Sequence, residues 1–306
     1  MDGLGWRGIE RGGVSSGVRF RFAGGMAVVT GAGSGIGRGL ALALAREGMR
    51  VVVVGRDEGS LAETVGLVAE VGGSAWSVVC DVSDREQVFE LSDRVRSDGG
   101  GIDVLALNAG VTTAGPLVGH SPADWDWVFG TVLMGVVYGI EAFLGGMLSR
   151  GSGQILITGS QVGITPDVVL YHGPYTSAKA AVSGLAVALR PEAAERGVGV
   201  SLLVPAGVHT GLMDSAERRP SVLSGEIASE DVPHPSGAIF PRPGGPELAP
   251  GGGEWLDPDR VAEIAVEGIR LDKPFIVTHP GMKPVVEEYT SRLLKAYDDG
   301  APGSVG

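Results

Sequence analysis

The stretch Thr30–Gly37, which reads TGAGSGIG, decides the fold of this chain. A β-branched run, Ala27–Val29, precedes it, and an apolar run with helical periodicity, Leu40–Ala45, follows it. This order predicts a strand, a tight turn and a helix. The spacing is T-G-x-x-x-G-x-G, set by Gly31, Gly35 and Gly37.

A turn of this kind suits a dinucleotide. Glycines let the backbone bend sharply and approach a pyrophosphate, and the N-terminus of the helix offers free N–H groups and the positive end of its dipole. The spacing differs from the common G-x-G-x-x-G. A glycine loop alone is equally compatible with a flexible strand–helix turn, so the rest of the chain has to decide.

Composition limits the possible functions. The 306 residues are 43% hydrophobic and 20% charged, which is enough for a sizeable core in one large α/β domain or two small ones. The formal net charge of −12 argues against a general nucleic-acid partner. Cys80 is the only cysteine, so no internal disulfide can form. Neither a signal peptide nor an apolar run of membrane-spanning length is apparent, and we expect a cytoplasmic protein without a membrane partner.

The order of apolar runs predicts an α/β fold. Residues 1–22 read as a disordered leader, and residues 23–306 as one domain. In that domain strands alternate with helices, which implies a doubly wound parallel sheet of the Rossmann type. The proline- and glycine-rich stretch 211–253 interrupts the alternation and is predicted to be a substrate lid that is mobile without ligand. The expected strands are 27–29, 51–54, 76–80, 102–108, 154–158, 198–204 and 275–278, and the longest expected helices are 121–148 and 175–196.

Chemistry is suggested by Ser160, Tyr175 and Lys179. Ser160 follows the fifth predicted strand, and Tyr175 and Lys179 lie four apart on one face of the next helix. A nearby ammonium lowers the pKa of a phenol, which would make the tyrosine an acid/base near neutral pH, and a serine hydroxyl can hold a substrate oxygen. Alone, a Tyr-x-x-x-Lys pair is as consistent with an ordinary surface pair. In a chain that also has the glycine turn and a serine after the fifth predicted strand, the catalytic interpretation of Tyr175 and Lys179 is favoured.

With these residues in place, the chain resembles the classical short-chain dehydrogenase/reductase family. The likeness runs from about residue 22 to residue 205 and continues more loosely to the C-terminus. It rests on Thr30–Gly37, Asp81, Asn108-Ala109-Gly110, Ser160, Tyr175, Lys179, Pro205 and Thr210.

The resemblance implies a role for each matching residue. Tyr175 would be the acid/base, Lys179 would bind the nicotinamide ribose and tune Tyr175, and Ser160 would orient the carbonyl or alcohol. Thr210 would contact the carboxamide of the nicotinamide, and Asn108 would lie under the cofactor and stabilise the centre of the sheet. The other cofactor-binding residues implied are Gly31, Gly35 and Gly37 with Ser34 and Ile36 at the pyrophosphate, Asp81 and Val82 at the adenine, and Ala109, Gly110, Pro205 and Val208.

Three departures from the family pattern are visible. Val132 stands where an asparagine is expected to support a water relay behind the lysine, which puts the proton path in question. The spacing from Ser160 to Tyr175 is longer than usual, with Tyr171-His172-Gly173 filling the insertion. Ala206 follows Pro205 where glycine is usual. The last two departures are expected to reshape the mouth of the pocket or the nicotinamide cradle.

The end of the second strand bears on the choice of cofactor. An NAD site uses a carboxylate there to accept from the ribose 2′-hydroxyl, but Gly55 holds that position and Arg56 follows it. Glycine removes repulsion toward a 2′-phosphate, and a guanidinium can pair with it. The sequence therefore predicts NADP. NAD stays open as the alternative, because Asp57 could turn back to the ribose.

The leading hypothesis is an NAD(P)-dependent oxidoreductase that interconverts a carbonyl and a secondary alcohol, with a hydrophobic or cyclic substrate and no metal. Val132 favours an alternative, a homologue that binds cofactor but has lost or changed its chemistry; a purely structural subunit is a third possibility. The resemblance also implies a homodimer or homotetramer through helices 121–148 and 175–196. His172 is interpreted as a solvated loop residue rather than a substrate contact, while His209 is left open between the cofactor and the lid hinge.

Overall fold

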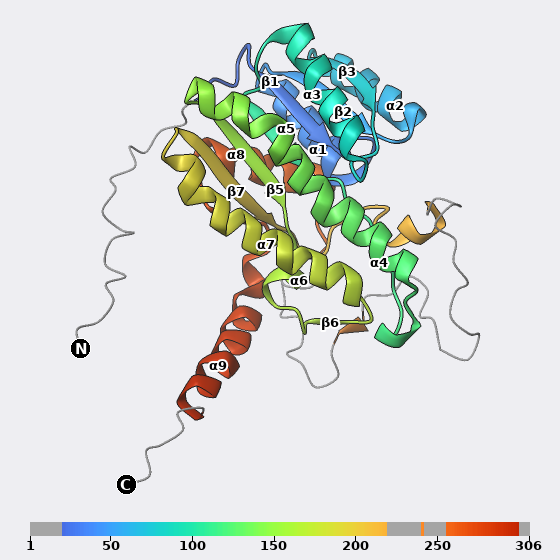
Figure 1. The fold of residues 1–306 in the computed structure, drawn as a ribbon, viewed down its shortest axis with the longest axis vertical. Coiled ribbons are helices and arrows are strands. Elements are labelled where there is room, and N and C mark those ends of the chain that lie inside the picture. Colours follow the sequence, from blue (N-terminus) through green and yellow to red (C-terminus); the bar gives the residue numbers. More distant parts are fainter. Residues whose placement is uncertain (1–19, 219–239, 242–254, 300–306) are drawn as a thin grey trace, which may run out of the picture.

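Seven parallel strands in the order β3-β2-β1-β4-β5-β7-β9 form the centre of the molecule (Figure 1). The structure, a computed structural model, describes residues 20–218, 240–241 and 255–299. In chain order the strands are β1 (Met26–Thr30), β2 (Arg50–Gly55), β3 (Ser74–Val79), β4 (Val104–Leu107), β5 (Gly153–Thr158), β7 (Val198–Val204) and β9 (Phe275–Val277). The strand order reverses between β1 and β4, which confirms the predicted doubly wound Rossmann sheet.

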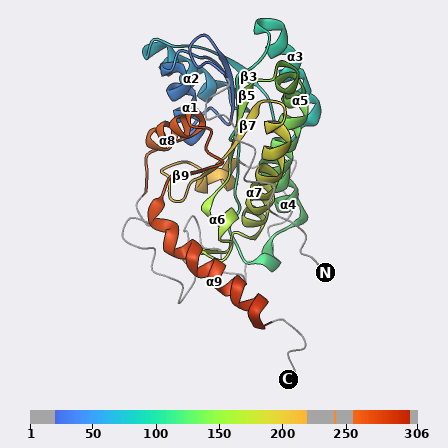
Figure 2. The same ribbon diagram turned by 90° about the vertical axis from the view of Figure 1, so that its left-hand side faces the viewer.

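Helices cover both faces of the sheet (Figures 1 and 2). One face packs against α1 (Gly35–Arg46), α2 (Glu58–Glu70) and α8 (Pro258–Arg270). The other packs against α3 (Arg85–Gly99), the long helix Pro122–Arg150 and α7 (Gly173–Ala194).

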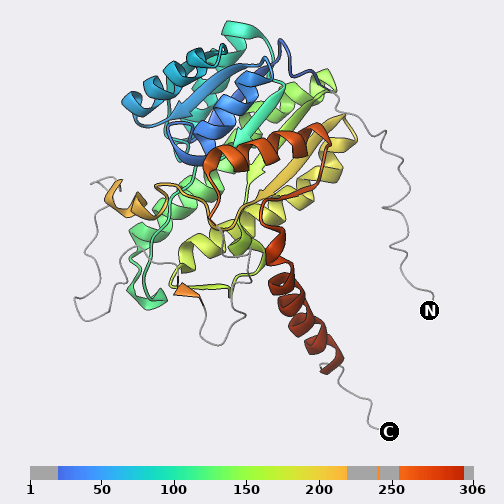
Figure 3. The same cartoon turned by 180° about the vertical axis from the view of Figure 1, so that it is seen from behind.

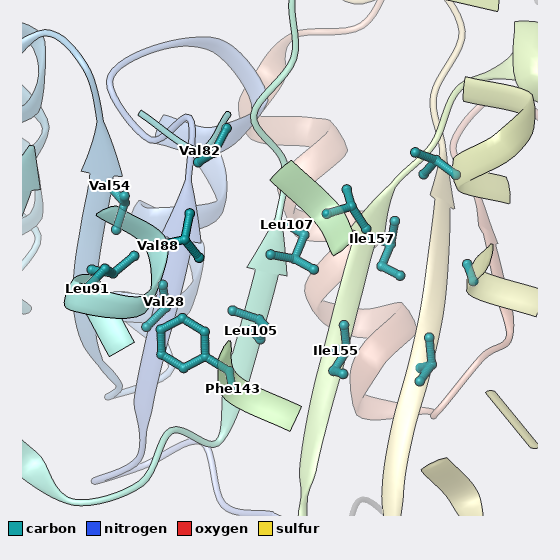
Figure 4. Close-up of a cluster of buried hydrophobic side chains, with 14 of the residues drawn as sticks. Val28, Val54, Val82, Val88, Leu91, Leu105, Leu107, Phe143, Ile155 and Ile157 are labelled. Carbon is teal, nitrogen blue, oxygen red and sulfur yellow. The ribbon is translucent and has the colours of Figure 1, made fainter. Parts of the chain in front are cut away.

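Side chains that alternate along each strand fill these two cores. Val28 and Leu105 point to the α3 side of the sheet, where Phe143 meets them (Figure 4). Ala27 and Val29 belong to the opposite core with α1 and α8. Because successive strand residues face opposite sides, a strand buried on both faces must be apolar throughout, as β1 is.

The long helix differs from its prediction. The sequence predicts one helix over 121–148, whereas the structure has α4 (Pro122–Phe129), a π-helical segment (Gly130–Met134) and α5 (Gly135–Arg150). A capping box between Ser121 and Asp124 starts it. A Cβ on Gly139 would lie 2.4 Å from the Leu107 side chain, so glycine lets this helix lie directly on β4.

Among the described residues, this same helix, Pro122–Arg150, is the one that is long and apolar enough to cross a membrane by length and composition. The core helix of a soluble protein passes the same test. Here Trp127, Val132, Val136 and Met147 of the helix are buried against the sheet, and we therefore interpret it as a core helix.

Short elements lie at the carboxyl edge of the sheet. They are η1 (Leu117–Gly119), α6 (Gln161–Ile164), β6 (Val169–Leu170), η3 (Met213–Arg218) and β8 (Phe240–Pro241). β8, from within the predicted lid, pairs antiparallel with β6, a contact that the sequence does not predict. The rest of that lid, 219–239 and 242–254, lies outside the described residues.

The predicted domain limits can be compared at both ends. Phe22, assigned from the sequence to the leader, is buried in the core, and the Arg270 guanidinium lies 4.5 Å from its ring centroid. Residues 1–19 lie outside the described part of the chain. After η5 (Pro280–Met282), helix α9 (Lys283–Asp299) extends away from the sheet (Figures 2 and 3). Its first turn is anchored by buried Val285, and Arg292 pairs with Asp167.

Candidate active site

The glycine turn between β1 and α1 leaves no space for side chains. A Cβ on Gly31 would lie 2.8 Å from the Ala109 Cα, and one on Gly37 would lie 2.1 Å from the Gly31 carbonyl oxygen. Gly31 also has a left-handed φ of 65°. Ser34 is the N-cap of α1, but its side chain caps no N–H group. The first N–H groups of α1 therefore remain available for an anion, as a pyrophosphate site requires.

Asn108 fastens the strand ends beside this turn. Its backbone N–H donates to Thr30 Oγ1 (2.9 Å), its Nδ2 donates to the Thr30 carbonyl (3.1 Å), and its Oδ1 accepts from Thr158 Oγ1 (3.1 Å). Ala109 N also donates to Thr30 Oγ1, at 3.1 Å. These bonds tie β1, β4 and β5 together where the sheet opens, next to the proposed chemistry.

Ser160, Tyr175 and Lys179 come together at the end of β5. Ser160 is the N-cap of α6, with its Oγ accepting from Val162 N at 3.4 Å, and it hydrogen-bonds Tyr175. Tyr175 and Lys179 lie in the first turns of α7. The Lys179 ammonium donates to the Thr158 carbonyl at 2.6 Å and lies 5.7 Å from the Tyr175 ring centroid.

Burial controls the charges of this trio. It raises the pKa of Tyr175 from 10.0 to about 12, with the hydrogen bond to Ser160 acting in the opposite direction. It lowers the pKa of Lys179 from 10.5 to about 8. The expectation that the ammonium would lower the phenol's pKa is therefore wrong for this structure: desolvation around the Tyr175 hydroxyl has the larger effect. Tyr175 is protonated at neutral pH, which is the state of a general acid.

An open cleft joins the turn and the trio. The sequence-predicted residues that line it are Gly31, Ser34, Gly35, Ile36, Asn108, Gly110, Ser160, Tyr175, Lys179, Pro205, Val208 and Thr210. Those predicted but not lining it are Gly37, Arg56, Asp81, Val82 and Ala109. Leu212 and Met213, from the segment 211–253 predicted as a lid, also line it, and Trp255 lines it without having been predicted. Trp255 lies three residues before Pro258, the proline that starts α8, but an aromatic residue in that place carries no recognisable signal.

Arg56 and Asp81 face each other beyond the cleft lining. Arg56 Nη1 lies 3.6 Å from Asp81 Oδ2, and both side chains are partly exposed. Asp57 is the N-cap of α2 and accepts from Ser60 N (2.7 Å) and Ser60 Oγ. The Asp57 carboxylate is therefore committed to the helix, while the guanidinium of Arg56 lies at the end of β2.

The two candidate histidines have different environments. His172 is buried, and its Nδ1 lies 3.2 Å from Thr112 Oγ1, so the interpretation of a solvated loop residue is wrong. The loop after β4 covers it, through a bridge between Gly115 and His172 that sequence spacing does not reveal. His209 is exposed and packs on Trp255, with ring centroids 5.5 Å apart.

Val132 lies in the π-helical segment and is fully buried. A Cβ built on Gly110 would be 4.0 Å from Val132 Cγ2 and 3.9 Å from Lys179 Nζ. The valine methyl group and the lysine ammonium therefore flank the same glycine. The departure from the family pattern is thus located beside Lys179, one of the three residues that the sequence predicts to be catalytic.

Comparison with known proteins agrees with this architecture. The short chain dehydrogenase family matches residues 25–220. A C alpha-dehydrogenase of Sphingobium sp. strain SYK-6 is 27% identical over 88% of this chain and 85% of its own length. A short chain dehydrogenase/reductase from Burkholderia phymatum, solved in complex with NAD, is 34% identical, with a TM-score of 0.78 over 90% of this chain and 96% of that one.

A metagenomic short-chain oxidoreductase solved in complex with NADP is 27% identical, with a TM-score of 0.64 over 84% of this chain and 95% of that one. Relatives of this fold thus occur with either nicotinamide cofactor. The family match covers more than half of the chain and includes the glycine turn and the whole trio. The chain belongs to the short-chain dehydrogenase/reductase family, as an oxidoreductase of that family.

Proposed function

We propose that the protein interconverts a carbonyl and a secondary alcohol with a nicotinamide cofactor bound in the cleft, and that it prefers NADP. The observation that carries the proposal is the convergence of Ser160, Tyr175 and Lys179 with the glycine turn in one cleft. Two relatives solved with NAD and NADP support the class of cofactor. The close backbone approach at Gly31 and Gly37 and the available N–H groups of α1 fit a pyrophosphate.

The bound cofactor supplies or accepts a hydride; this chain's residues manage the oxygen and its proton. Ser160 Oγ orients the substrate oxygen, and the protonated Tyr175 hydroxyl donates to that oxygen during reduction and accepts from it during oxidation. The Lys179 ammonium, held by the Thr158 carbonyl, adds positive charge that stabilises the phenolate left after proton donation. Metal assistance is not part of the proposal.

The preference for NADP rests on the end of β2. Gly55 carries no carboxylate there, and Arg56 offers a guanidinium to a 2′-phosphate. Asp57, the alternative NAD ligand, is occupied as the cap of α2. Asp81 neutralises part of the charge of Arg56, and we therefore propose a preference rather than an exclusive use of NADP.

The substrate end of the cleft supports a hydrophobic or cyclic carbonyl compound. Leu212, Met213 and Trp255 line the cleft together with the trio. Apolar walls with a few convergent polar groups are typical of small-molecule sites. The burial of Val132 keeps the second candidate open, a homologue that binds cofactor with lost or altered chemistry.

The test is oxidation of NADPH and NADH by the purified protein on a panel of cyclic, aryl and aliphatic ketones. We expect turnover with a higher kcat/KM for NADPH. Equal or better use of NADH would overturn the cofactor preference. Tight binding of cofactor without turnover of any ketone or of the matching alcohols would favour the altered homologue.

A homodimer or homotetramer and a cytoplasmic location complete the proposal. Helices α4, α5 and α7 are the proposed interface, and Val187 on α7 is half exposed, as an interface residue of an isolated chain would be. Sedimentation or light scattering at micromolar concentration measures the assembly. A monomeric mass would refute it.

A further inference from the structure

The loop from Pro205 to His209, which lines the cleft after β7, is held by two distant parts of the chain. Leu256 N donates to the Gly207 carbonyl (3.0 Å), and His209 N donates to the Leu256 carbonyl (3.0 Å). From the other side, His279 contacts the backbone of Ala206 and Gly207. The loop is therefore clamped between the start of α8 and the end of β9.

His279 makes two backbone contacts, one with an N–H donor and one with a carbonyl acceptor. Ala206 N donates to its Nδ1 at 3.2 Å, and its Nε2 lies 2.9 Å from the Gly207 carbonyl oxygen. The Thr278 hydroxyl lies 2.7 Å from the same Nδ1. His279 is only 3% exposed. The buried ring therefore holds two peptide groups, Pro205–Ala206 through its N–H and Gly207–Val208 through its carbonyl.

These contacts assign the ring proton. A carbonyl oxygen can only accept, so Nε2 must carry hydrogen, and an N–H donor at Ala206 requires a lone pair on Nδ1. The Thr278 hydroxyl has a single hydrogen, which can be donated to Nδ1 at 2.7 Å or to the Val204 carbonyl oxygen at 3.4 Å. With the proton on Nδ1 instead, Ala206 N–H would face another N–H and the Nε2 lone pair would face the Gly207 oxygen. Only the Nε2-protonated tautomer satisfies both backbone contacts.

The second side of the clamp is formed by Trp255, which lies just before α8 in the sequence. A Cβ on Gly207 would lie 3.3 to 3.4 Å from the Trp255 ring atoms, so the indole lies directly on the backbone of Gly207. Ala206, the departure from the family pattern, directs its N–H to His279. Trp255 therefore leaves little room for a side chain at position 207.

We propose that His279 is a positioning residue for the cofactor. It fixes the Pro205–Ala206 and Gly207–Val208 peptides, and with them the wall of the cleft formed by Pro205 and Val208, in the geometry that binds the nicotinamide half. The inference rests on the proposed function for its cofactor. The clamp itself is a property of the protein alone. Removing it is expected to weaken cofactor binding more than the chemical step, because no contact of His279 reaches Ser160, Tyr175 or Lys179.

Three substitutions separate the two contacts. His279→Asn places an amide oxygen where Nδ1 is and keeps an acceptor for Ala206 N–H. His279→Gln reaches the position of Nε2 and keeps a donor for the Gly207 carbonyl. His279→Phe retains a ring and removes both. Lys283→Gln, four residues later and exposed, is the matched control.

The first measurement is the Kd for NADPH, by titration of its fluorescence. One lost hydrogen bond corresponds to about fivefold, so we expect a rise of about fivefold for His279→Asn and His279→Gln and of tenfold or more for His279→Phe. The KM for the cofactor should rise in parallel, with kcat and the carbonyl KM within about threefold of wild type. A Kd within twofold of wild type in a folded His279→Phe protein overturns the proposal. If that variant does not fold, the Asn and Gln variants decide in the same way.

The second measurement needs no cofactor. Amide hydrogen exchange at Ala206 should be slow in the wild type, the control and His279→Asn, and faster in His279→Gln and His279→Phe. The ¹⁵N spectrum should show the His279 proton on Nε2. A proton on Nδ1, or the same Ala206 exchange in all variants, overturns the clamp. A wild type that binds no nicotinamide cofactor would refute the proposed function, while these two readouts would still judge the clamp.

Discussion

The two ends of the cleft are built by different means. At the turn end, Gly31 to Gly37, the glycines carry no side chain. The backbone can therefore approach Ala109 closely, and the N–H groups of α1 stay available. The chemical end works through side chains that are buried, with the pKa of Tyr175 raised and that of Lys179 lowered. The turn end therefore tolerates no added atom, and the chemical end carries groups that reduce the stability of the fold. The two ends should respond differently to substitution.

The largest effect is expected at the chemical end, for Tyr175→Phe. The substitution removes one hydroxyl and leaves the glycine turn intact, so the general acid is lost while the cofactor still binds. General acid–base groups contribute about 10² to 10⁴-fold, and we expect kcat to fall by about 10³-fold or more, to the limit of detection. Steady-state kinetics on the best ketone, with the Kd for NADPH alongside, measure both. Full activity would show that the chemistry lies elsewhere and would favour the altered homologue.

The next effect is expected at the turn end, for Gly37→Ala. A Cβ there would lie 2.1 Å from a backbone oxygen and 2.6 Å from Asn108 Nδ2, so the turn has to move. We expect cofactor affinity to fall by about 100-fold, and the free energy of unfolding to fall by about 1 to 3 kcal/mol, as overpacking does.

Gly66→Ala in α2 is the matched control for that substitution. A Cβ on Gly66 has nothing within 4 Å, so alanine should add about 0.5 to 1 kcal/mol of stability without a change in binding. Calorimetry measures the stability of the two variants, and cofactor titration measures their affinity. Both variants gain one methyl group, at a position with close neighbours in Gly37→Ala and at one without neighbours within 4 Å in Gly66→Ala. Equal results for both would refute the account of the turn.

Lys179→Met sharpens the contrast in stability. The folded pKa of Lys179, about 8, lies below the unfolded value of 10.5, so the unfolded chain binds more protons between these pH values and wild-type stability rises with pH there. Below pH 8 the buried charge costs about 3 kcal/mol. Methionine removes that cost and loses the hydrogen bond to Thr158, worth about 1 kcal/mol.

We therefore expect an inactive Lys179→Met variant that is about 2 kcal/mol more stable at pH 7, with the difference shrinking from pH 8 to 10.5. Urea unfolding at several pH values gives the curve. Lys283→Met, at an exposed position, is the control and should show no such trend. A variant less stable than wild type at pH 7 would contradict the assigned cost of the buried ammonium.

Arg56→Ala tests the end of β2, beside the glycine turn, and we expect a smaller effect on the use of cofactor. Loss of a charge-assisted contact to a 2′-phosphate should reduce kcat/KM for NADPH by about tenfold and leave that for NADH nearly unchanged. Stability should change by less than about 1 kcal/mol, because the pair with Asp81 is partly exposed. Arg50→Ala, at the exposed start of the same strand, is the control. An equal loss with both cofactors would remove Arg56 from the recognition of the phosphate.

How much could be predicted from the sequence follows the same division. The seven strands, the flanking helices and the turn could be predicted, because hydrophobic period and glycine spacing are local properties of the chain. The meeting of Ser160 with Tyr175 could also be predicted, because Ser160 follows β5 at the carboxyl edge of the sheet and Tyr175 opens the next long helix along the chain, α7. What these side chains meet there is set by the rest of the fold.

The predictions that were wrong concern burial and contacts between residues far apart in the sequence. The pKa of Tyr175 moves opposite to the expectation because desolvation, which a sequence does not show, outweighs the hydrogen bond with Ser160. His172 is buried because the loop after β4 closes over it. Trp255 and His279 reach the same cleft loop from parts of the chain far from it in sequence. Spacing carries no information about such approaches.

The smallest effect on activity is expected for Val132→Asn. When Tyr175 gives up its proton, another has to reach it from solvent, and Lys179 needs a water behind it to pass one on. Valine offers neither a donor nor an acceptor for that water, whereas the trio itself remains in place, so the relay should limit the rate only modestly. Because Val132 lies fully buried beside Gly110 and Lys179, an amide placed there could bind the water.

We expect kcat of Val132→Asn to equal or exceed that of the wild type, within about 10²-fold even if the relay were the slowest step. Stability should fall by about 1 to 3 kcal/mol where the amide lacks a partner in the core. Val132→Thr has a similar shape and a single hydroxyl, and its kcat and stability should lie between those of the wild type and Val132→Asn. Solvent isotope effects on kcat read the proton step directly: a smaller effect in the asparagine variant is expected. A kcat reduced more than tenfold, with an unchanged isotope effect, would show that protons reach Tyr175 by a route that does not pass Val132.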